Sequence, residues 1–181
     1  AQYNLAFMHE NGEGVLQDYA EAVKWYRKAA EQEDADAQFA VGSMYANGEG
    51  VLQDYAEAAK WYRKAADQGL DRAQDLLGDL YNLGEGVLQD YAEAVKWYRM
   101  AAEQGYADAQ TNLALMYLIG QGVLQDNIMA HVWSNIGSVN GDENSPKVRE
   151  IVAERMTSED ISKAQALARE CMSSNYQKCG W

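Results

Sequence analysis

One eleven-residue segment, Gly-Glu-Gly-Val-Leu-Gln-Asp-Tyr-Ala-Glu-Ala, occurs three times in this chain without a single change. The copies begin at Gly12, Gly48 and Gly84, and a diverged fourth copy begins at Gly120, so the spacing is always 36 residues. A fixed period of this length is typical of proteins in which one supersecondary unit stacks on the next. Such chains usually bind partners along an extended concave surface and seldom catalyse a reaction.

The first half of each repeat has the pattern of an amphipathic helix. In the second repeat, residues 37–72, Ala37, Val41 and Tyr45 are spaced to form one apolar face. Gly48 follows this face and can close the helix by adopting the left-handed conformation. We expect the apolar pair 51–52 in the connector to pack beneath the turn.

The second half of each repeat reads as another helix. Asp54 is placed to cap its N-terminus, and Glu57 follows three residues later, as in a capping box. Trp61 and Tyr62 fall on the apolar stripe, and Gly69 ends the segment. The unit is therefore a helix–turn–helix hairpin, and the whole chain is predicted to be an all-α solenoid.

A tryptophan recurs at the same place in every second helix. Because it recurs at core spacing, we interpret it as core packing between repeats, with a ladder that stacks on a ligand as the alternative. The four residues are Trp25, Trp61, Trp97 and Trp133.

The residues that recur at fixed spacing are best seen in the third copy. They are Ala73, Leu77, Gly78, Tyr81, Gly84, Gly86, Val87, Asp90, Ala94, Trp97, Tyr98, Ala101 and Ala102. This pattern closely resembles the Sel1-like repeat family, which is related to the tetratricopeptide repeats, and the resemblance covers residues 1–144. It implies a right-handed α-solenoid with repeats at 1–36, 37–72, 73–108 and 109–144.

The resemblance also implies a function. Members of the family serve as non-enzymatic protein-interaction scaffolds, several of them in bacterial envelope or secreted systems, so we expect a periplasmic or secreted protein that needs no cofactor. One cysteine-rich bacterial branch of the family has been linked to β-lactam binding. A small-molecule-binding or weakly hydrolytic envelope protein is therefore the alternative, and a self-assembling array is a third reading. This chain has one cysteine pair, whereas that branch has a pair in every repeat.

Residues 145–181 lie beyond the repeats and are predicted to form a two-helix C-terminal cap. Ser145 and Pro146 mark the start of the first cap helix, and Thr157 can cap the second. No equivalent cap is visible at the N-terminus. Because Ala1 falls in repeat phase, we interpret the chain as processed or trimmed, and the open end as available for further repeats or for self-association.

The two cysteines of the chain, Cys171 and Cys179, are eight residues apart. A continuous helix would hold them about 12 Å apart along its axis, too far for a disulfide. The segment Ser173–Asn175 is suitable for a turn that would bring them together. A disulfide is the preferred reading, and two free thiols are the alternative.

Comparison of the copies identifies a variable face on each first helix. Positions 3, 7 and 10 of the repeat change freely, and their spacing places them on one face. First helices line the concave side in this architecture, so we predict a groove that binds a protein or peptide with a basic group between apolar anchors. The alternative is that nothing constrains these positions. The candidate partner-binding residues, with the position-4 asparagines, are Tyr3, Asn4, Phe7, Phe39, Ser43, Asp75, Asp79, Asn82, Thr111, Asn112, Leu115 and Leu118.

The formal net charge of −13 argues against nucleic acid or an anionic membrane surface as the main partner. No apolar run approaches the length of a membrane helix, so direct membrane insertion is not expected. His9 and His131 lie at opposite ends of the array, and we expect neither a shared metal site nor a catalytic role for them.

Overall fold

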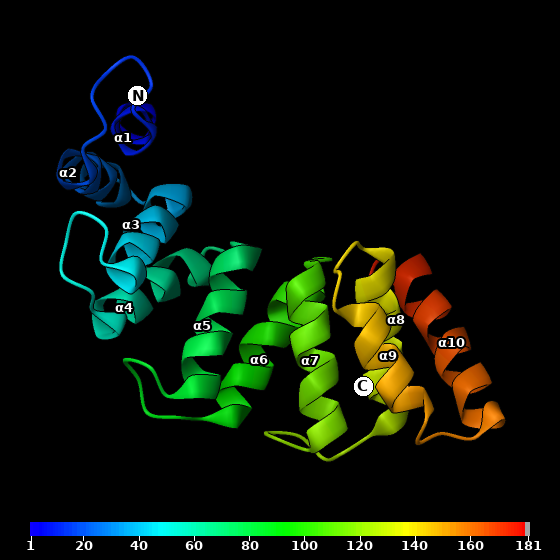
Figure 1. Cartoon of the computed structure of the whole chain (residues 1–181). Helices are drawn as coiled ribbons and strands as arrows, with labels where there is room; N and C mark the ends of the chain where they lie inside the picture. Colours follow the sequence, from blue (N-terminus) through cyan, green and yellow to red (C-terminus); the bar gives the residue numbers. More distant parts are fainter. Residues whose placement is uncertain (180–181) are drawn as a thin grey trace. The chain divides into compact units, whose positions relative to one another are not determined.

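The computed structural model describes residues 1–179, and these residues form ten α-helices and no strand (Figure 1). The all-α solenoid of helix–turn–helix repeats that the period predicted is therefore confirmed. The helices are α1 (Gln2–Asn11), α2 (Tyr19–Ala30), α3 (Ala35–Asn47), α4 (Tyr55–Asp67), α5 (Asp71–Leu83), α6 (Tyr91–Ala102), α7 (Ala107–Ile119), α8 (Asn127–Val139), α9 (Ser145–Ala153) and α10 (Ser158–Ser173).

The chain divides into two compact units, one of residues 1–89 and one that begins at Asp90. The first contains α1 to α5 and the second contains α6 to α10. The division falls between α5 and α6, inside the third predicted repeat at 73–108. Each unit is described below by itself.

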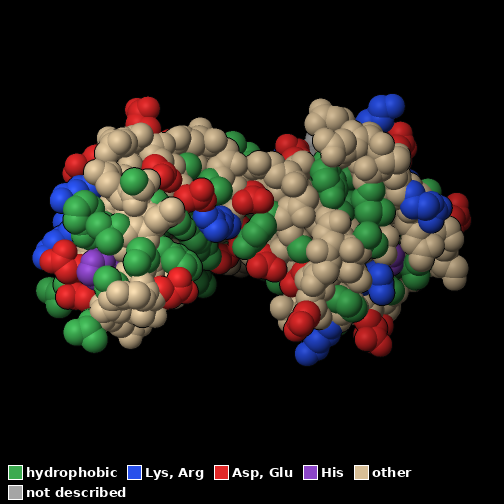
Figure 2. Space-filling view, turned by 90° about the horizontal axis from the view of Figure 1, so that it is seen from above, with side chains coloured by type: hydrophobic (Ala, Val, Ile, Leu, Met, Phe, Trp, Pro, Cys, Tyr) green, Lys and Arg blue, Asp and Glu red, His purple; other side chains and the backbone are tan. Residues whose placement is uncertain are grey.

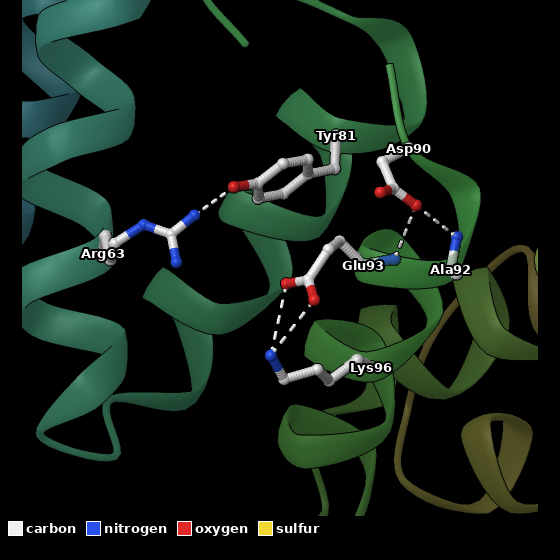
Figure 3. Close-up of polar contacts among 6 residues, drawn as sticks. All are labelled: Arg63, Tyr81, Asp90, Ala92, Glu93 and Lys96. Atoms are coloured by element: carbon white, nitrogen blue, oxygen red, sulfur yellow. Dashed lines mark hydrogen bonds and ion pairs between the residues drawn. The ribbon is translucent and has the colours of Figure 1, made fainter. Parts of the chain in front are cut away.

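Aspartates cap the second helix of each repeat, as the sequence predicted. The Asp54 carboxylate accepts hydrogen bonds from the backbone N–H groups of Ala56 and Glu57, at 2.9 and 3.0 Å. Asp90 caps α6 in the same way, and Glu93 in the first turn of that helix pairs with Lys96 (Figure 3). These caps satisfy amide groups that the helix itself leaves without acceptors.

The loop inside each repeat also contacts the repeat before it. Gly48 ends α3 with φ of 75°, a left-handed conformation that glycine adopts without strain. Gly50 has φ of 70°, and a Cβ placed on it would lie only 2.3 Å from the backbone oxygen of Tyr19. The loop of the second repeat therefore rests directly on the first turn of α2, with no space for a side chain at residue 50.

Buried glutamines tie consecutive repeats together. Gln38 at the start of α3 donates a hydrogen bond to the backbone oxygen of Ala30 at 3.2 Å. Gln74 donates to Ala66 in the same way, at 3.1 Å. Their carbonyl partners belong to the last turn of the preceding second helix, where backbone oxygens lack partners within the helix. Gln110 donates to the backbone oxygen of Ala102 in the same way, at 3.0 Å, so this bond explains the glutamine at the second position of the second, third and fourth repeats.

An arginine–tyrosine contact adds to each of these junctions. Arg63 on α4 donates a hydrogen bond to the hydroxyl of Tyr81 on α5 (Figure 3). In the second unit Arg99 donates to the Tyr117 hydroxyl at 3.0 Å. The arginine of one repeat thus holds the tyrosine in the first helix of the next.

The tryptophans differ in their environment. Trp97 and Trp133 are buried in the second unit. Trp25 and Trp61 in the first unit are only partly buried, and the ammonium groups of Lys28 and Lys64 lie 3.9 and 4.1 Å above their ring centres. Cation–π contact accounts for the outward faces of these two rings.

The expectation that both apolar residues of the connector pack beneath the turn was wrong for the leucine. Leu52 is 91% exposed, and the equivalent leucines are similarly exposed. Val51 is partly buried and packs against the core of the first two repeats. The side chains of consecutive residues in the extended connector point in opposite directions, so only the valine can face the core. The other leucines of this kind are Leu16, Leu88 and Leu124.

The C-terminal helices α8, α9 and α10 lie side by side in the second unit (Figure 1). Pro146 stands in the first turn of α9, and the Thr157 side chain caps α10 by accepting from the N–H of Asp160 at 3.1 Å. Asn144, rather than the expected Ser145, occupies the N-cap position of α9. The two helices thus cover α8, which has no following repeat to bury it.

The chain reverses after α10 through Asn175 and Tyr176, both of which have positive φ. This turn places Cys179 against Cys171, and the two form a disulfide. Both cysteines are buried, and the Tyr176 hydroxyl accepts a hydrogen bond from Asn140 at 2.9 Å. The reversal thereby fastens the last described residues to the end of α8.

Candidate functional site

The twelve predicted binding residues differ in how far they reach the surface. Phe7 is 42% exposed, Leu115 is 37% exposed, and Asn4 is also exposed. Six others are partly exposed, namely Tyr3, Phe39, Ser43, Asp79, Asn82 and Asn112. Asp75, Thr111 and Leu118 are buried.

Burial corrects the expectation that these last three residues line an open surface. Thr111 donates a hydrogen bond to Asp142 at 2.7 Å and bonds the Ser145 hydroxyl, so it anchors the C-terminal cap. Leu118 stands beside the connector into α8, whose Gln125 donates to the Leu118 backbone oxygen at 2.8 Å. Asp75 is buried on α5, whereas Phe39 at the equivalent position of α3 is partly exposed. None of these contacts could be recognised from the repeat alignment.

Tyr3 and Glu10 of α1 form one connected group with Tyr26 of α2. The rings of Tyr3 and Tyr26 meet edge to face with centres 5.2 Å apart. The Tyr26 hydroxyl donates to the Glu10 carboxylate at 2.6 Å. Burial, followed by the bond to Glu10, raises the pKa of Tyr26, so its phenol stays protonated at neutral pH. Positions 3 and 10 of the first repeat are thus linked through the second helix.

The same arrangement recurs on α3 and α4 with different side chains. Phe39 lies against Tyr62 with ring centres 5.6 Å apart, and the Tyr62 hydroxyl donates to the Ser43 hydroxyl at 3.2 Å. The guanidinium carbon of Arg72 lies 4.5 Å from the centre of the Phe39 ring, and the same guanidinium forms an ion pair with Asp36. Position 3 in this repeat is therefore partly covered by a cation of the protein itself.

A glycine makes the approach of Tyr62 feasible. A Cβ placed on Gly42 would lie 2.7 Å from two carbons of the Tyr62 ring. The tyrosine therefore packs directly on the backbone of α3, with its hydroxyl directed to Ser43. Burial raises the pKa of Tyr62, and the nearby Asp79 carboxylate adds to this rise.

An open cleft of about 330 Å³ lies where α3, α4 and α5 meet in the first unit. Its polar lining includes Ser43 from α3, Tyr62 from α4 and Asp79 from α5. Apolar side chains complete it, among them Leu76 and Leu83. Ser43 and Asp79 are two of the predicted residues, and the cleft brings them together beside an apolar wall.

The remaining predicted residues do not join this cleft. Asn4 and Phe7 lie on α1, and Asn82 near the end of α5 accepts a hydrogen bond from Gln89 through its backbone oxygen. Asn112 and Leu115 lie on α7 in the second unit. The variable face is thus a set of local surfaces, and the cleft in the first unit is the one that brings two predicted residues together.

Of the residues that line the cleft, the sequence had predicted Ser43 and Asp79 and missed the others. Tyr62 was assigned to the core because the Trp-Tyr pair recurs unchanged, although its hydroxyl reaches the variable face. Leu76 stands at the repeat position of Asn4 and Asn112, but it was not itself predicted. The proximity of the tyrosine to α3 depends on Gly42, a signal that the sequence contains.

The surface around these sites mixes two kinds of side chain. On the face shown in Figure 2, acidic and hydrophobic side chains lie next to one another. Among residues 1–179, no group of three or more histidine, cysteine or acidic side chains is arranged to hold a metal ion. No helix of the described chain combines the length and apolarity that a membrane span requires.

Comparison with known protein families gives one match. The family model described as Sel1 repeat matches four consecutive segments, residues 1–34, 35–70, 71–106 and 107–136. These segments together cover most of the chain and agree with the repeat period. No curated protein sequence matches the chain significantly.

Solved structures provide three further likenesses. A protective antigen of uropathogenic Escherichia coli with an SLR fold is 43% identical with a TM-score of 0.78, over 80% of this chain and 31% of that protein. A Sel1 repeat protein from Oxalobacter formigenes is 39% identical with a TM-score of 0.76, over 80% of this chain and 59% of that protein. This chain therefore spans less than two thirds of the length of either protein.

The third likeness concerns the fold alone. Cysteine-rich protein B of Helicobacter pylori is 22% identical with a TM-score of 0.58, over 73% of this chain and 95% of that protein. Sel1 repeat proteins are generally non-catalytic protein-interaction scaffolds, and the structural relatives named here are bacterial.

Proposed function

Because the chain belongs to the Sel1 repeat family, we propose that it is a scaffold that binds a protein or peptide through the variable faces of its first helices. The cleft between α3, α4 and α5 is the primary contact point of this proposal. It combines a carboxylate at Asp79 with apolar side chains at Leu76 and Leu83. This is the single observation that carries the proposal.

The chemistry of the cleft fits one kind of peptide. A lysine or arginine side chain could place its charge near Asp79 while the neighbouring apolar residue contacts the leucines. The net charge of −13 attracts a basic segment before it contacts the protein and so favours its association. The partner is therefore expected to carry a basic residue flanked by apolar ones.

The proposal also includes the exposed apolar side chains of α1 and α7. Phe7 and Leu115 are surface residues that a partner would cover. A periplasmic or secreted location and self-association through the N-terminal end belong to the same proposal, and the bacterial relatives are compatible with that location.

A peptide-display screen against the intact protein tests the proposal. The peptides enriched should contain a basic residue next to apolar ones, and fluorescence polarisation should give saturable binding of the best sequence. Asp79→Asn should weaken binding about fivefold to twentyfold, the effect of one partly exposed charge pair. Asp67→Asn is the matched control, because Asp67 lies at the exposed end of α4 and outside this cleft.

Circular dichroism should show the same helix content for both variants. Equal weakening by the two substitutions would mean that general charge governs binding. Enrichment of acidic or purely polar peptides would refute the assignment of the cleft.

A further inference from the structure

A second cleft lies in the C-terminal part of the second unit, where α8, α9 and α10 meet, and its volume is about 650 Å³. Of these helices α8 is the second helix of the fourth repeat, whereas α9 and α10 follow residue 136, where the family match ends. Its polar lining comes from three helices: His131 and Asn135 from α8, Arg149 and Glu150 from α9, and Gln165 from α10. The stacking of repeats does not require this set of side chains.

Arg149 is held in the cleft by a neutral partner. Its guanidinium donates a hydrogen bond to the side-chain oxygen of Asn135 at 3.0 Å. Within residues 1–179, Arg149 forms no ion pair, although the protein carries almost twice as many acidic as basic side chains. An arginine fixed by an amide oxygen keeps its other N–H donors directed elsewhere, in a geometry that suits a planar anion.

His131 lines the same cleft from α8. The residue is 2% exposed, and its Nδ1 atom is buried. The ring is therefore part of the cleft wall and lies close enough to the Arg149 charge to respond to it. Burial and then the nearby Arg149 charge lower the pKa of His131, so the ring is neutral at pH 7 and can donate or accept one hydrogen bond.

The other lining residues restrict the ligand. Glu150 brings a negative charge to the same cleft, which disfavours a dianion such as phosphate near a single arginine. Pro146, Ala153 and Ile161 offer an apolar wall to the rest of a ligand. A monoanion with a planar head and a short apolar body satisfies all of these features.

We propose that the cleft between α8, α9 and α10 binds the carboxylate group of a small organic acid through Arg149. Asn135 positions the guanidinium, and the His131 ring forms part of the cleft wall. The apolar body of the acid lies against Ile161 and Ala153. This site is separate from the peptide-binding cleft of the first unit and does not depend on it.

The test is an NMR titration of the intact protein with sodium butyrate at pH 7.5. The chain has two histidines, and their imidazole signals give a probe and an internal reference. The His131 signals should shift with saturation at millimolar butyrate, while those of His9 in the first unit should not move. A ligand of this size is not expected to bind more tightly.

Substitutions test whether the Arg149 guanidinium binds the carboxylate of butyrate. Arg149→Gln should raise the dissociation constant of butyrate at least tenfold. Lys147→Gln is the matched control, because it removes the same charge from the same helix at a residue that does not line the cleft. Asn135→Ala should raise the dissociation constant about threefold to tenfold with the Arg149 charge intact, so the proposal remains testable if the Arg149 variant does not fold.

Three other small molecules test whether the cleft prefers an apolar chain, a cation or a dianion to a carboxylate. Equal His131 shifts with 1-butanol would mean that only the apolar wall binds. Preference for n-butylamine would assign the cleft to a cation at Glu150, and tighter binding of inorganic phosphate would contradict a monoanion site. Absence of a saturable shift with butyrate, or an unchanged dissociation constant in both Arg149→Gln and Asn135→Ala, would overturn the proposal.

Discussion

Replacement of Gly50 by alanine should reveal how much the contact between consecutive repeats contributes to stability. Gly50 has φ of 70°, and its Cβ would lie 2.3 Å from the Tyr19 backbone oxygen. Gly14 stands at the same place in an identical loop with φ of 75°, but its Cβ would meet only a methionine methyl carbon, Met8 Cε, at 3.4 Å. Alanine at either position would have the same left-handed strain, but only alanine at residue 50 would meet the backbone of a neighbouring helix.

The expected magnitudes follow from this difference. A left-handed alanine costs about 1–2 kcal/mol relative to its preferred conformation, and both variants incur this cost. Gly50→Ala must also move a backbone segment of α2 away from the loop, and overpacking of this kind typically costs about 1–3 kcal/mol. We therefore expect Gly50→Ala to be about 1–3 kcal/mol less stable than Gly14→Ala.

Urea unfolding followed by tryptophan fluorescence measures this difference. Both substitutions lie in the first unit with Trp25 and Trp61, whereas Trp97 and Trp133 report on the second unit, which is the same in both variants. With a slope of about 1–3 kcal/mol per molar urea, the midpoint of Gly50→Ala should lie clearly below that of Gly14→Ala. Equal midpoints would refute the claim that the loop of one repeat rests on the helix of the repeat before it.

Reduction of the Cys171–Cys179 disulfide should lower the free energy of unfolding of the second unit by about 2–3 kcal/mol, the loop-closure value for a loop of this length, and thermal melts with and without reductant would show it. Thr111→Val should destabilise the same unit by about 1–3 kcal/mol because Asp142 and Ser145 lose a hydrogen-bond partner, and an unchanged melting temperature would contradict its role in the cap. His131 has a lowered pKa, so the unfolded state binds its proton more readily; its contribution to stability is present above about pH 6.5 and is lost as the pH falls below that value, by at most about 1.4 kcal/mol per pH unit. His131→Gln should flatten the decline in stability between pH 7 and pH 5, and an unchanged slope would exclude this histidine as its source.

The sequence alone determined the repeat architecture. An unchanged segment every 36 residues, with Asp54-type caps and Gly48-type helix ends, leaves few alternatives to stacked helical hairpins. Caps, helix ends and amphipathic faces depend on residues close together in the chain, so local patterns are sufficient to predict them. The Cys171–Cys179 disulfide was also the preferred prediction, because Ser173–Asn175 are residues that favour a turn close to the first cysteine.

Only the tertiary structure decided which variable positions reach the surface and which side chains meet in the two clefts. Thr111 occupies the same repeat position as the partly exposed Phe39, yet Ser145 of α9 contacts it because α9 follows the last repeat. Arg149 and Asn135 are fourteen residues apart on different helices, and the repeat pattern does not predict their contact, since α9 lies outside the repeats. The physical reason is that a repeat pattern records the contacts that every copy shares, whereas exposure and clefts depend on the particular neighbour that each copy has in space.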